Sequence, residues 1–163
     1  METINIPIQF GGGRLDPSVV VVHCMAEYVV DSDGKSYHAI EFLKKMGWSA
    51  HAFVTPSGTV IRSRNDNRVA WHAKAQGHNY KALGIEFLVP GAHDWIDFKR
   101  TIRHEYLTHQ QYEAGVRFCR EEWVEKLGIL HYVKHSSIDP ANKPDPGDGF
   151  PWPQFLTDIG VMS

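Results

Sequence analysis

Cysteine is scarce in this sequence, which has only Cys24 and Cys119 among its 163 residues. Two cysteines do not make a disulfide framework, so we expect both thiols to stay reduced. A chain of this length can bury a sizeable core without cross-links or a structural metal, and we expect one domain over residues 1–163. A metal ion in this protein is therefore predicted to serve chemistry rather than folding.

Surplus basic charge and long apolar runs are also missing. The 17 lysines and arginines are outnumbered by 19 aspartates and glutamates, so composition predicts no binding to nucleic acid or to anionic membranes. The longest clear apolar run, Val19–Val22, is far too short to span a bilayer. The first residues lack the pattern of a secretory signal. We therefore expect a monomer that is cytoplasmic as synthesised and needs another factor to leave the cell.

The first half of the sequence contains a strand pattern followed by a helix pattern. The β-branched run 18–24 predicts a buried central strand that ends near His23. Apolar spacing over residues 36–48 predicts a helix, with Ser36 as its N-cap and Gly47 as its C-terminal stop. A strand that feeds directly into a helix is typical of proteins in which both kinds of element share one core.

The middle of the chain predicts three further segments. Residues 49–63 predict a β-hairpin, because the sequence Pro56-Ser57-Gly58 supplies the restricted and positive φ angles of a tight turn. Residues 82–90 predict a buried strand that carries one acid, Glu86, whose position requires an explanation. Residues 91–103 are irregular and aromatic, which indicates a long surface loop.

The last third of the chain predicts two helices with a strand between them. Thr108 and Gln111 have the spacing of a capping box, ahead of an apolar stripe that ends at Gly128. Residues 129–135 predict a short strand, and residues 150–160 a terminal helix whose prolines suit its first turn. The order of elements predicts an α/β fold with a central mixed β-sheet flanked by helices.

Three potential metal ligands lie at or just after the ends of predicted strands, namely His23, His135 and Asp145. A catalytic zinc site takes three protein ligands, drawn mainly from histidine and carboxylate, and leaves the fourth position to water. Zinc lowers the pKa of that water to roughly 7, which makes hydrolysis feasible at neutral pH. Taken singly, each residue has an ordinary alternative, since the chain has ten histidines and Asp-Pro-Gly is a common turn sequence.

Five sequence pieces, taken together, indicate a family. They are VVHC at 21–24, SAHAFVTPSGTV at 49–60, VAWHA at 69–73, GHNYKALGIEF at 77–87 and HSSIDPANKPDPG at 135–147. With these pieces in order, residues 19–155 resemble the zinc-dependent N-acetylmuramoyl-L-alanine amidases. That family includes short phage lysins, a cytosolic muropeptide-recycling amidase and the peptidoglycan recognition proteins, and the resemblance implies their shared α/β fold.

The resemblance also implies roles for individual residues. It matches His23, His135 and Asp145 to the zinc ligands, Glu86 to the glutamate that activates water, and Lys143 to the lysine that stabilises the oxyanion. These roles suit the residues, because burial of Glu86 in an apolar strand should raise its pKa. Lys143, two residues before a ligand, would lie where negative charge develops. The alternatives are a structural Glu86 paired with a basic residue and a solvated loop lysine.

Further residues keep two interpretations open. Trp71, His72 and Asn79 fall where family members line the substrate groove, but packing of Trp71 and hydrogen bonds that fix the loop would explain them equally well. Cys24 offers a thiolate, which is itself a good zinc ligand. Its side chain should point away from that of His23 if both residues lie in a strand, so we expect a structural role. Ala50 stands where some phage members carry a catalytic tyrosine, which increases the role expected of Glu86.

The sequence thus predicts a zinc-dependent amidase that cleaves the bond between N-acetylmuramic acid and L-alanine in peptidoglycan or its fragments. We expect a phage or prophage endolysin that reaches the wall through a holin-type partner. One alternative is a cytosolic amidase that recycles anhydro-muropeptides. Another is a peptidoglycan-binding module without catalysis, although such a module need not retain the three ligands together with Glu86 and Lys143.

Overall fold

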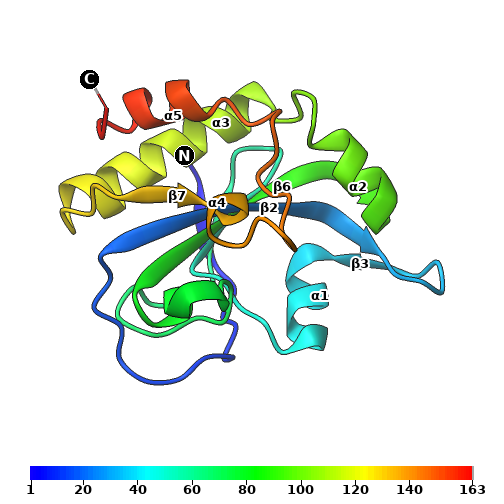
Figure 1. Cartoon of the computed structure of the whole chain (residues 1–163), viewed down its shortest axis with the longest axis horizontal. Helices are drawn as coiled ribbons and strands as arrows, with labels where there is room; N and C mark the ends of the chain where they lie inside the picture. Colours follow the sequence, from blue (N-terminus) through cyan, green and yellow to red (C-terminus); the bar gives the residue numbers. More distant parts are fainter. Residues whose placement is uncertain (163) are drawn as a thin grey trace.

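A curled, mixed β-sheet runs through the centre of the protein, with helices on both of its faces (Figure 1). The computed structural model describes residues 1–162. The sheet has seven strands in the order β1-β5-β4-β6-β2-β3, and β7 pairs with β2 outside this path. Their bounds are β1 Thr3–Asn5, β2 Val19–Val30, β3 Ser36–His38, β4 Ala52–Val54, β5 Val60–Arg62, β6 Ala82–His93 and β7 Tyr132–Lys134. The predicted fold class is confirmed.

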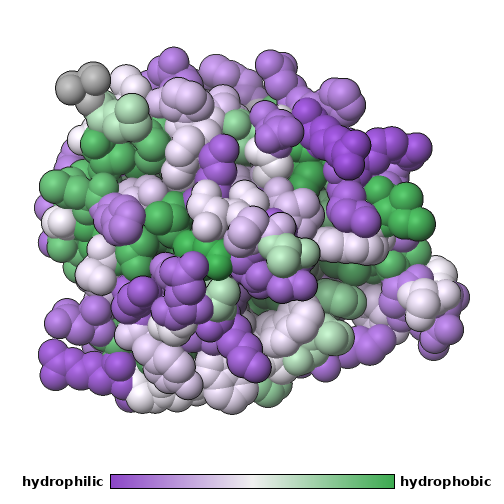
Figure 2. Space-filling model, viewed as in Figure 1, coloured by the Kyte–Doolittle hydropathy of each residue, from purple (hydrophilic) through white to green (hydrophobic). Residues whose placement is uncertain are grey.

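Helices of different lengths cover the sheet. They are α1 Ala39–Met46, α2 Trp95–Thr101, α3 His109–Phe118, α4 His135–Ile138 and α5 Trp152–Asp158, with a 3₁₀ segment η1 Ala75–Tyr80 and a π-helical segment η2 Cys119–Glu125. In Figure 1, α3 and α5 cover one face of the sheet, while α1 and η1 lie on the other. No helix within the described residues is long and apolar enough to cross a membrane. On the face drawn in Figure 2, hydrophobic residues reach the surface in separate patches.

The parallel pair β2 and β6 forms the core of the sheet. The valines of Val19–Val22 are at most 3% exposed, as expected for a strand covered on both faces. β2 continues to Val30, so the prediction that this strand ends near His23 is wrong, and the histidine lies within the strand. The register of the pair sets His23 directly beside Glu86. The sheet itself therefore brings a histidine and a carboxyl group together.

The start of α1 differs from the sequence prediction. Ser36 belongs to β3, which pairs with the far end of β2, and α1 begins at Ala39 with His38 as its N-cap. The Nδ1 atom of His38 accepts a hydrogen bond from the backbone of Ile40, which is the role that the prediction gave to serine. The predicted end of the helix is confirmed, because Gly47 adopts the left-handed conformation that closes many helices.

The long surface loop predicted over residues 91–103 is wrong. β6 extends to His93, and α2 follows almost at once, with Asp94 as its N-cap. The Asp94 side chain accepts a hydrogen bond from the backbone of Asp97, which provides the start signal of a short helix. The hairpin predicted over residues 49–63 is confirmed by antiparallel pairing of β4 with β5.

The predicted helix after Thr108 is present, but its capping box is only half formed. Thr108 accepts a hydrogen bond from the backbone of Gln111, as predicted. The Gln111 side chain is fully buried and does not reach back to Thr108. Its Nε2 atom donates instead to the backbone oxygens of Val54 and Leu88, at 2.8 Å each. Gln111 therefore ties α3 to strands β4 and β6.

Replacing Gln111 with methionine is expected to lower the free energy of unfolding by about 2–4 kcal/mol. Two buried carbonyl groups lose their donor, and each unsatisfied group costs about 1–3 kcal/mol. Urea denaturation measures the effect, and Gln110→Met is the matched control, because Gln110 is exposed on the same helix. Equal stability of the two variants would contradict this account of Gln111.

Candidate metal centre and active site

Pairing of β7 with β2 brings two histidines from opposite ends of the chain together. Val22 of β2 pairs with Lys134 of β7 in a parallel register. The residues that follow them, His23 and His135, therefore lie side by side. His135 is the first residue of α4, immediately after β7. Asp145 follows in the loop after α4, where its backbone oxygen accepts a hydrogen bond from Ser136. Three separate segments therefore meet at one point.

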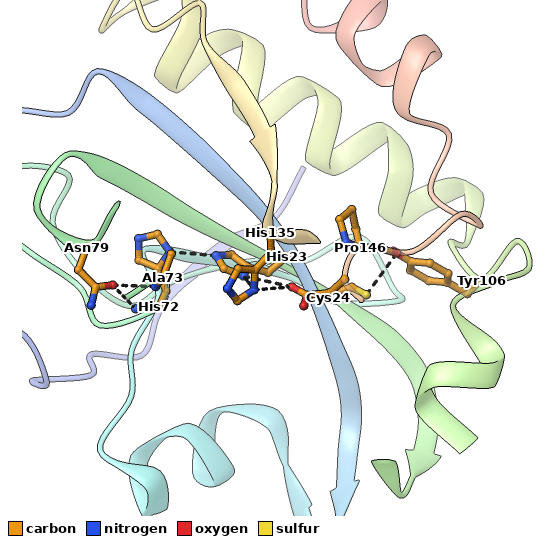
Figure 3. A network of polar contacts seen from close by, with 9 residues as sticks. His23, Cys24, His72, Ala73, Asn79, Tyr106, His135 and Pro146 are labelled. Atoms are coloured by element: carbon orange, nitrogen blue, oxygen red, sulfur yellow. Dashed lines mark hydrogen bonds and ion pairs between the residues drawn. The ribbon is translucent and has the colours of Figure 1, made fainter. Parts of the chain in front are cut away.

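The side chains of His23, His135 and Asp145 converge through one atom each, and Figure 3 shows the two histidine rings close together. The two Nδ1 atoms are 2.8 Å apart, and Asp145 Oδ2 lies 2.9 Å from His135 Nδ1 and 3.2 Å from His23 Nδ1. All three residues are buried, with 6% exposure or less. The three candidate ligands predicted from the sequence are thus brought together in a closed triangle of two nitrogens and one oxygen.

The three atoms of this triangle can serve together as ligands of a metal ion. Both rings cannot carry a hydrogen on Nδ1, because two donors would then face each other at 2.8 Å. Two bare nitrogens and a carboxylate form instead a set of three lone pairs, which is the ligand set of many catalytic zinc sites. Zinc bonds of about 2.0–2.2 Å in a tetrahedral site separate neighbouring ligand atoms by about 3.3–3.6 Å, so the three atoms, 2.8–3.2 Å apart, would need to spread slightly to hold the ion.

The electrostatics of the three residues agree with a ligand role. Burial, followed by the neighbouring His135, lowers the pKa of His23 to about 4, so its ring is neutral at pH 7. Burial alone would raise the pKa of Asp145, but the adjacent side chains of His135 and His23 outweigh it and hold the pKa below its usual value. A neutral imidazole and an ionised carboxylate are the forms that bind metals.

Two side chains contact the loop of Asp145 at the backbone oxygen of Pro146. The backbone oxygen of Pro146 accepts a hydrogen bond from the Tyr106 hydroxyl at 2.9 Å, and the Cys24 thiol approaches the same oxygen at 3.5 Å (Figure 3). Cys24 lies next to His23 in β2 but directs its sulfur away from the triangle, as the alternation of side chains in a strand predicts. Burial, followed by the charge of Asp145, raises the pKa of the Cys24 thiol. This position agrees with the structural role expected of Cys24.

Replacing Cys24 with alanine is expected to leave zinc binding intact, because its sulfur bonds to a backbone oxygen and not to the ligand triangle. Metal content after dialysis, measured by mass spectrometry, checks this. Cys119→Ala is the matched control, since Cys119 is also buried but lies in η2, away from the site. Loss of zinc in the Cys24 variant alone would indicate that the thiolate is a ligand.

Glu86 is a buried acid that, within the described part of the chain, lacks the basic partner that a structural role would require. It is 8% exposed, and its Oε2 atom has no hydrogen-bond partner among the described residues. Burial, followed by the charge of Asp145, raises the pKa of Glu86 well above its usual value, although Lys143 opposes the effect. Such a carboxyl group is suited to accept and return a proton.

Lys143 lies in the same loop as Asp145, and an aromatic residue that the sequence interpretation missed lies beside it. Its Nζ atom is 5.9 Å from the centre of the Trp48 ring, within the range of a cation–π contact. Trp48 is 43% exposed and follows directly after the glycine that ends α1. The sequence gives little indication of this contact, because no local pattern links an aromatic residue after a helix to a loop 95 positions away.

The three residues predicted to line the groove differ in what they contact. Trp71 is 44% exposed and presents its ring to solvent. Asn79 Oδ1 accepts hydrogen bonds from the backbones of His72 and Ala73, so this amide fixes the loop. His72 contacts His23 directly, with 2.9 Å between His72 Nδ1 and His23 Nε2 (Figure 3). Of these three residues, only Trp71 leaves a large part of its side chain exposed for a substrate to contact.

Comparison with known proteins identifies the family of this chain. Residues 13–148 match the family Amidase_2, described as N-acetylmuramoyl-L-alanine amidase. The 1,6-anhydro-N-acetylmuramyl-L-alanine amidase AmpD of Haemophilus influenzae is 26% identical over 160 residues, which cover 94% of this chain and 76% of AmpD.

Two solved structures share the fold. N-acetylmuramoyl-L-alanine amidase LysC from Clostridium intestinale has a TM-score of 0.72 at 22% identity, over 99% of both chains. AmiD from E. coli, in complex with the substrate anhydro-N-acetylmuramic acid-L-Ala-D-gamma-Glu-L-Lys, has a TM-score of 0.66 at 21% identity, over 87% of this chain and 57% of AmiD. The fold agrees with the family match, and the chain therefore belongs to the N-acetylmuramoyl-L-alanine amidases, which are hydrolases of an amide bond in peptidoglycan.

Proposed function

We propose that the protein is a zinc-dependent amidase that cleaves the bond between the lactyl group of N-acetylmuramic acid and L-alanine. The observation that carries this proposal is the convergence of His23 Nδ1, His135 Nδ1 and Asp145 Oδ2 beside the buried carboxyl group of Glu86. These three residues would hold the ion. When bound, zinc would polarise the scissile carbonyl group and make a water molecule more acidic.

Glu86 would act as the proton carrier of the reaction. Its Oε2 atom, which has no hydrogen-bond partner among residues 1–162, would take a proton from the attacking water. The raised pKa of Glu86 favours retention of that proton, so the same carboxyl group can pass it to the departing nitrogen of L-alanine. Ala50 stands where some relatives carry a catalytic tyrosine, and alanine cannot transfer a proton. Proton transfer would therefore depend on Glu86.

Lys143 would stabilise the negative charge that develops on the carbonyl oxygen during attack. The influence of its charge on the pKa of both Glu86 and His23 supports a position close to the reacting atoms. A cation held near that oxygen favours the transition state over the substrate. Trp48, against which the ammonium group lies, would limit the positions that this flexible side chain samples.

Two substrate forms remain as candidates for the same chemistry. Intact peptidoglycan, the substrate of an endolysin, is favoured by the similarity in fold to the endolysine LysCS from Clostridium intestinale, over 99% of this chain and 97% of LysCS. Soluble anhydro-muropeptide is favoured by the similarity to AmpD, whose name specifies the 1,6-anhydro sugar. We propose the endolysin, in which exposed Trp71 would contact the wall polymer, and retain recycling as the second candidate.

Turnover of the two substrates by the zinc-loaded protein tests the proposal. Release of peptides that begin with L-alanine is measured on purified sacculi and on soluble anhydro-muropeptides, with and without a chelator. We expect release from sacculi, its loss with the chelator and its return with added zinc. Release from soluble muropeptides alone would favour recycling. Binding to sacculi without any release would instead indicate a module without catalysis.

A further inference from the structure

The imidazole ring of His72 lies between the candidate ligand His23 and the backbone of β6. Its Nε2 atom is 3.2 Å from the backbone oxygen of Ala82, and its Nδ1 atom is 2.9 Å from His23 Nε2. The rings of His23 and His72 meet nearly at right angles, with centres 5.1 Å apart. His72 therefore contacts the atom of His23 that faces away from the ligand triangle (Figure 3).

This arrangement fixes the hydrogen atoms of both rings. The Ala82 oxygen can only accept, so His72 Nε2 carries a hydrogen and donates it. The remaining nitrogen of His72 is then bare and accepts a hydrogen bond from His23 Nε2. His23 thus carries its hydrogen on Nε2, and its Nδ1 atom keeps a free lone pair facing His135 and Asp145.

Neighbouring residues on two sides of His72 hold its ring between His23 and the backbone of β6. A Cβ atom on Gly84 of β6 would lie 2.6 Å from both Cγ and Nδ1 of His72, so only glycine leaves room for the ring. On the other side, Asn79 Oδ1 accepts from the backbone nitrogens of His72 and Ala73, at 2.9 and 2.7 Å. The ring is therefore positioned by a glycine in β6 and by an amide at the end of η1.

We propose that His72 is a positioning residue that holds His23 in the tautomer able to bind zinc, and is not a substrate contact. The inference rests on the proposed zinc site. Ligand histidines usually donate their second nitrogen to a carboxylate, a backbone carbonyl or water, and loss of such a partner typically costs about 10–100-fold in metal affinity or activity. Here a neutral imidazole supplies the acceptor, and it is oriented in turn by the backbone of β6.

Two substitutions separate hydrogen bonding from packing. His72→Phe fills the same space without an acceptor, whereas His72→Gln keeps an acceptor for His23 and a donor for Ala82. We expect the dissociation constant for zinc, measured by chelator competition, to rise about 10–100-fold in the phenylalanine variant. The glutamine variant is expected to recover most of this loss. His78→Phe is the matched control, because His78 is buried in the same region and its ring bonds to Ala75.

The tautomer itself is read by nitrogen NMR of histidine in the metal-free protein. We expect His23 to carry its hydrogen on Nε2 in the wild-type protein and the glutamine variant, and to populate both tautomers in the phenylalanine variant. A hydrogen on Nδ1 of His23 in the wild-type protein would overturn the inference. Unchanged zinc affinity in the phenylalanine variant would overturn it as well.

The inference and the proposed function fail in different ways. A wild-type protein that binds no zinc counts against the proposed function, whereas the tautomer of metal-free His23 still decides the role of His72. If the phenylalanine variant does not fold, the NMR signals of the wild-type protein and the glutamine variant carry the test. If wild-type zinc binding is normal and all three variants match it, the zinc site stands and the positioning role of His72 is wrong.

Discussion

Replacing Asp145 with asparagine is expected to remove bound zinc and reduce amidase activity to background. The substitution keeps the shape of the side chain but replaces a carboxylate oxygen, 2.9 and 3.2 Å from the two histidine nitrogens, with a neutral amide. A divalent ion bound by two neutral imidazoles then loses the only negative charge in the triangle. Metal content and the release of L-alanine peptides are measured on the same preparation.

A matched control for this variant lies in the same loop. Asp148→Asn makes the same chemical change at an exposed position three residues away and is expected to keep both zinc and activity. An unchanged melting temperature in the two metal-free variants would separate ligand loss from unfolding. If Asp145→Asn retained zinc and full turnover, the three-ligand site would be contradicted.

Replacing Glu86 with glutamine is expected to lower kcat about 10²–10⁴-fold while zinc remains bound. That range is typical of the loss of a general acid–base group, and the amide can neither take a proton from water nor return it to the leaving nitrogen. Glu86 is not one of the three converging ligands, so metal content should not change. Steady-state kinetics with metal analysis of the same samples measure the result.

The same substitution is expected to stabilise the metal-free protein at neutral pH. Burial raises the pKa of Glu86 above its ordinary value of 4.5, so the folded state binds this proton more tightly than the unfolded state. Stability is therefore lost as pH rises from about 4.5 through the raised pKa, and glutamine removes that loss. Thermal melts across this pH range measure it, with exposed Glu125→Gln as control. Equal activity and equal pH dependence in both variants would contradict a proton-carrying role.

Much of the fold follows from local patterns in the sequence. The buried run Val19–Val22 and the hairpin turn at Pro56-Ser57-Gly58 predict strands where they occur, because burial on both faces and turn geometry are both local constraints. The sequence does not predict helix α2, because the start signal at Asp94 is a single capping contact in an aromatic segment. It also misplaces the N-cap of α1, because pairing with β2 places Ser36 in β3.

The candidate ligands could be named from the sequence, but their convergence could not be derived from local patterns. His23 and His135 become neighbours because Val22 pairs with Lys134 in the sheet. This long-range pairing is set by the tertiary fold and not by local sequence. The contact of Trp48 with the loop of Lys143 has the same origin.

The sequence suggests a groove position for His72 only through the resemblance to the amidase family. Its orientation toward His23 depends on the room left by Gly84, a close approach that only the folded chain reveals.

X-ray absorption at the zinc edge of the loaded wild-type protein tests the central claim most directly. The account predicts a first shell of nitrogen and oxygen atoms at about 2.0–2.2 Å, with the scattering pattern of two imidazole rings from His23 and His135 and no sulfur. A sulfur atom at about 2.3 Å would identify Cys24 as a ligand and contradict the proposed set. A shell without imidazole scattering would contradict the metal centre itself.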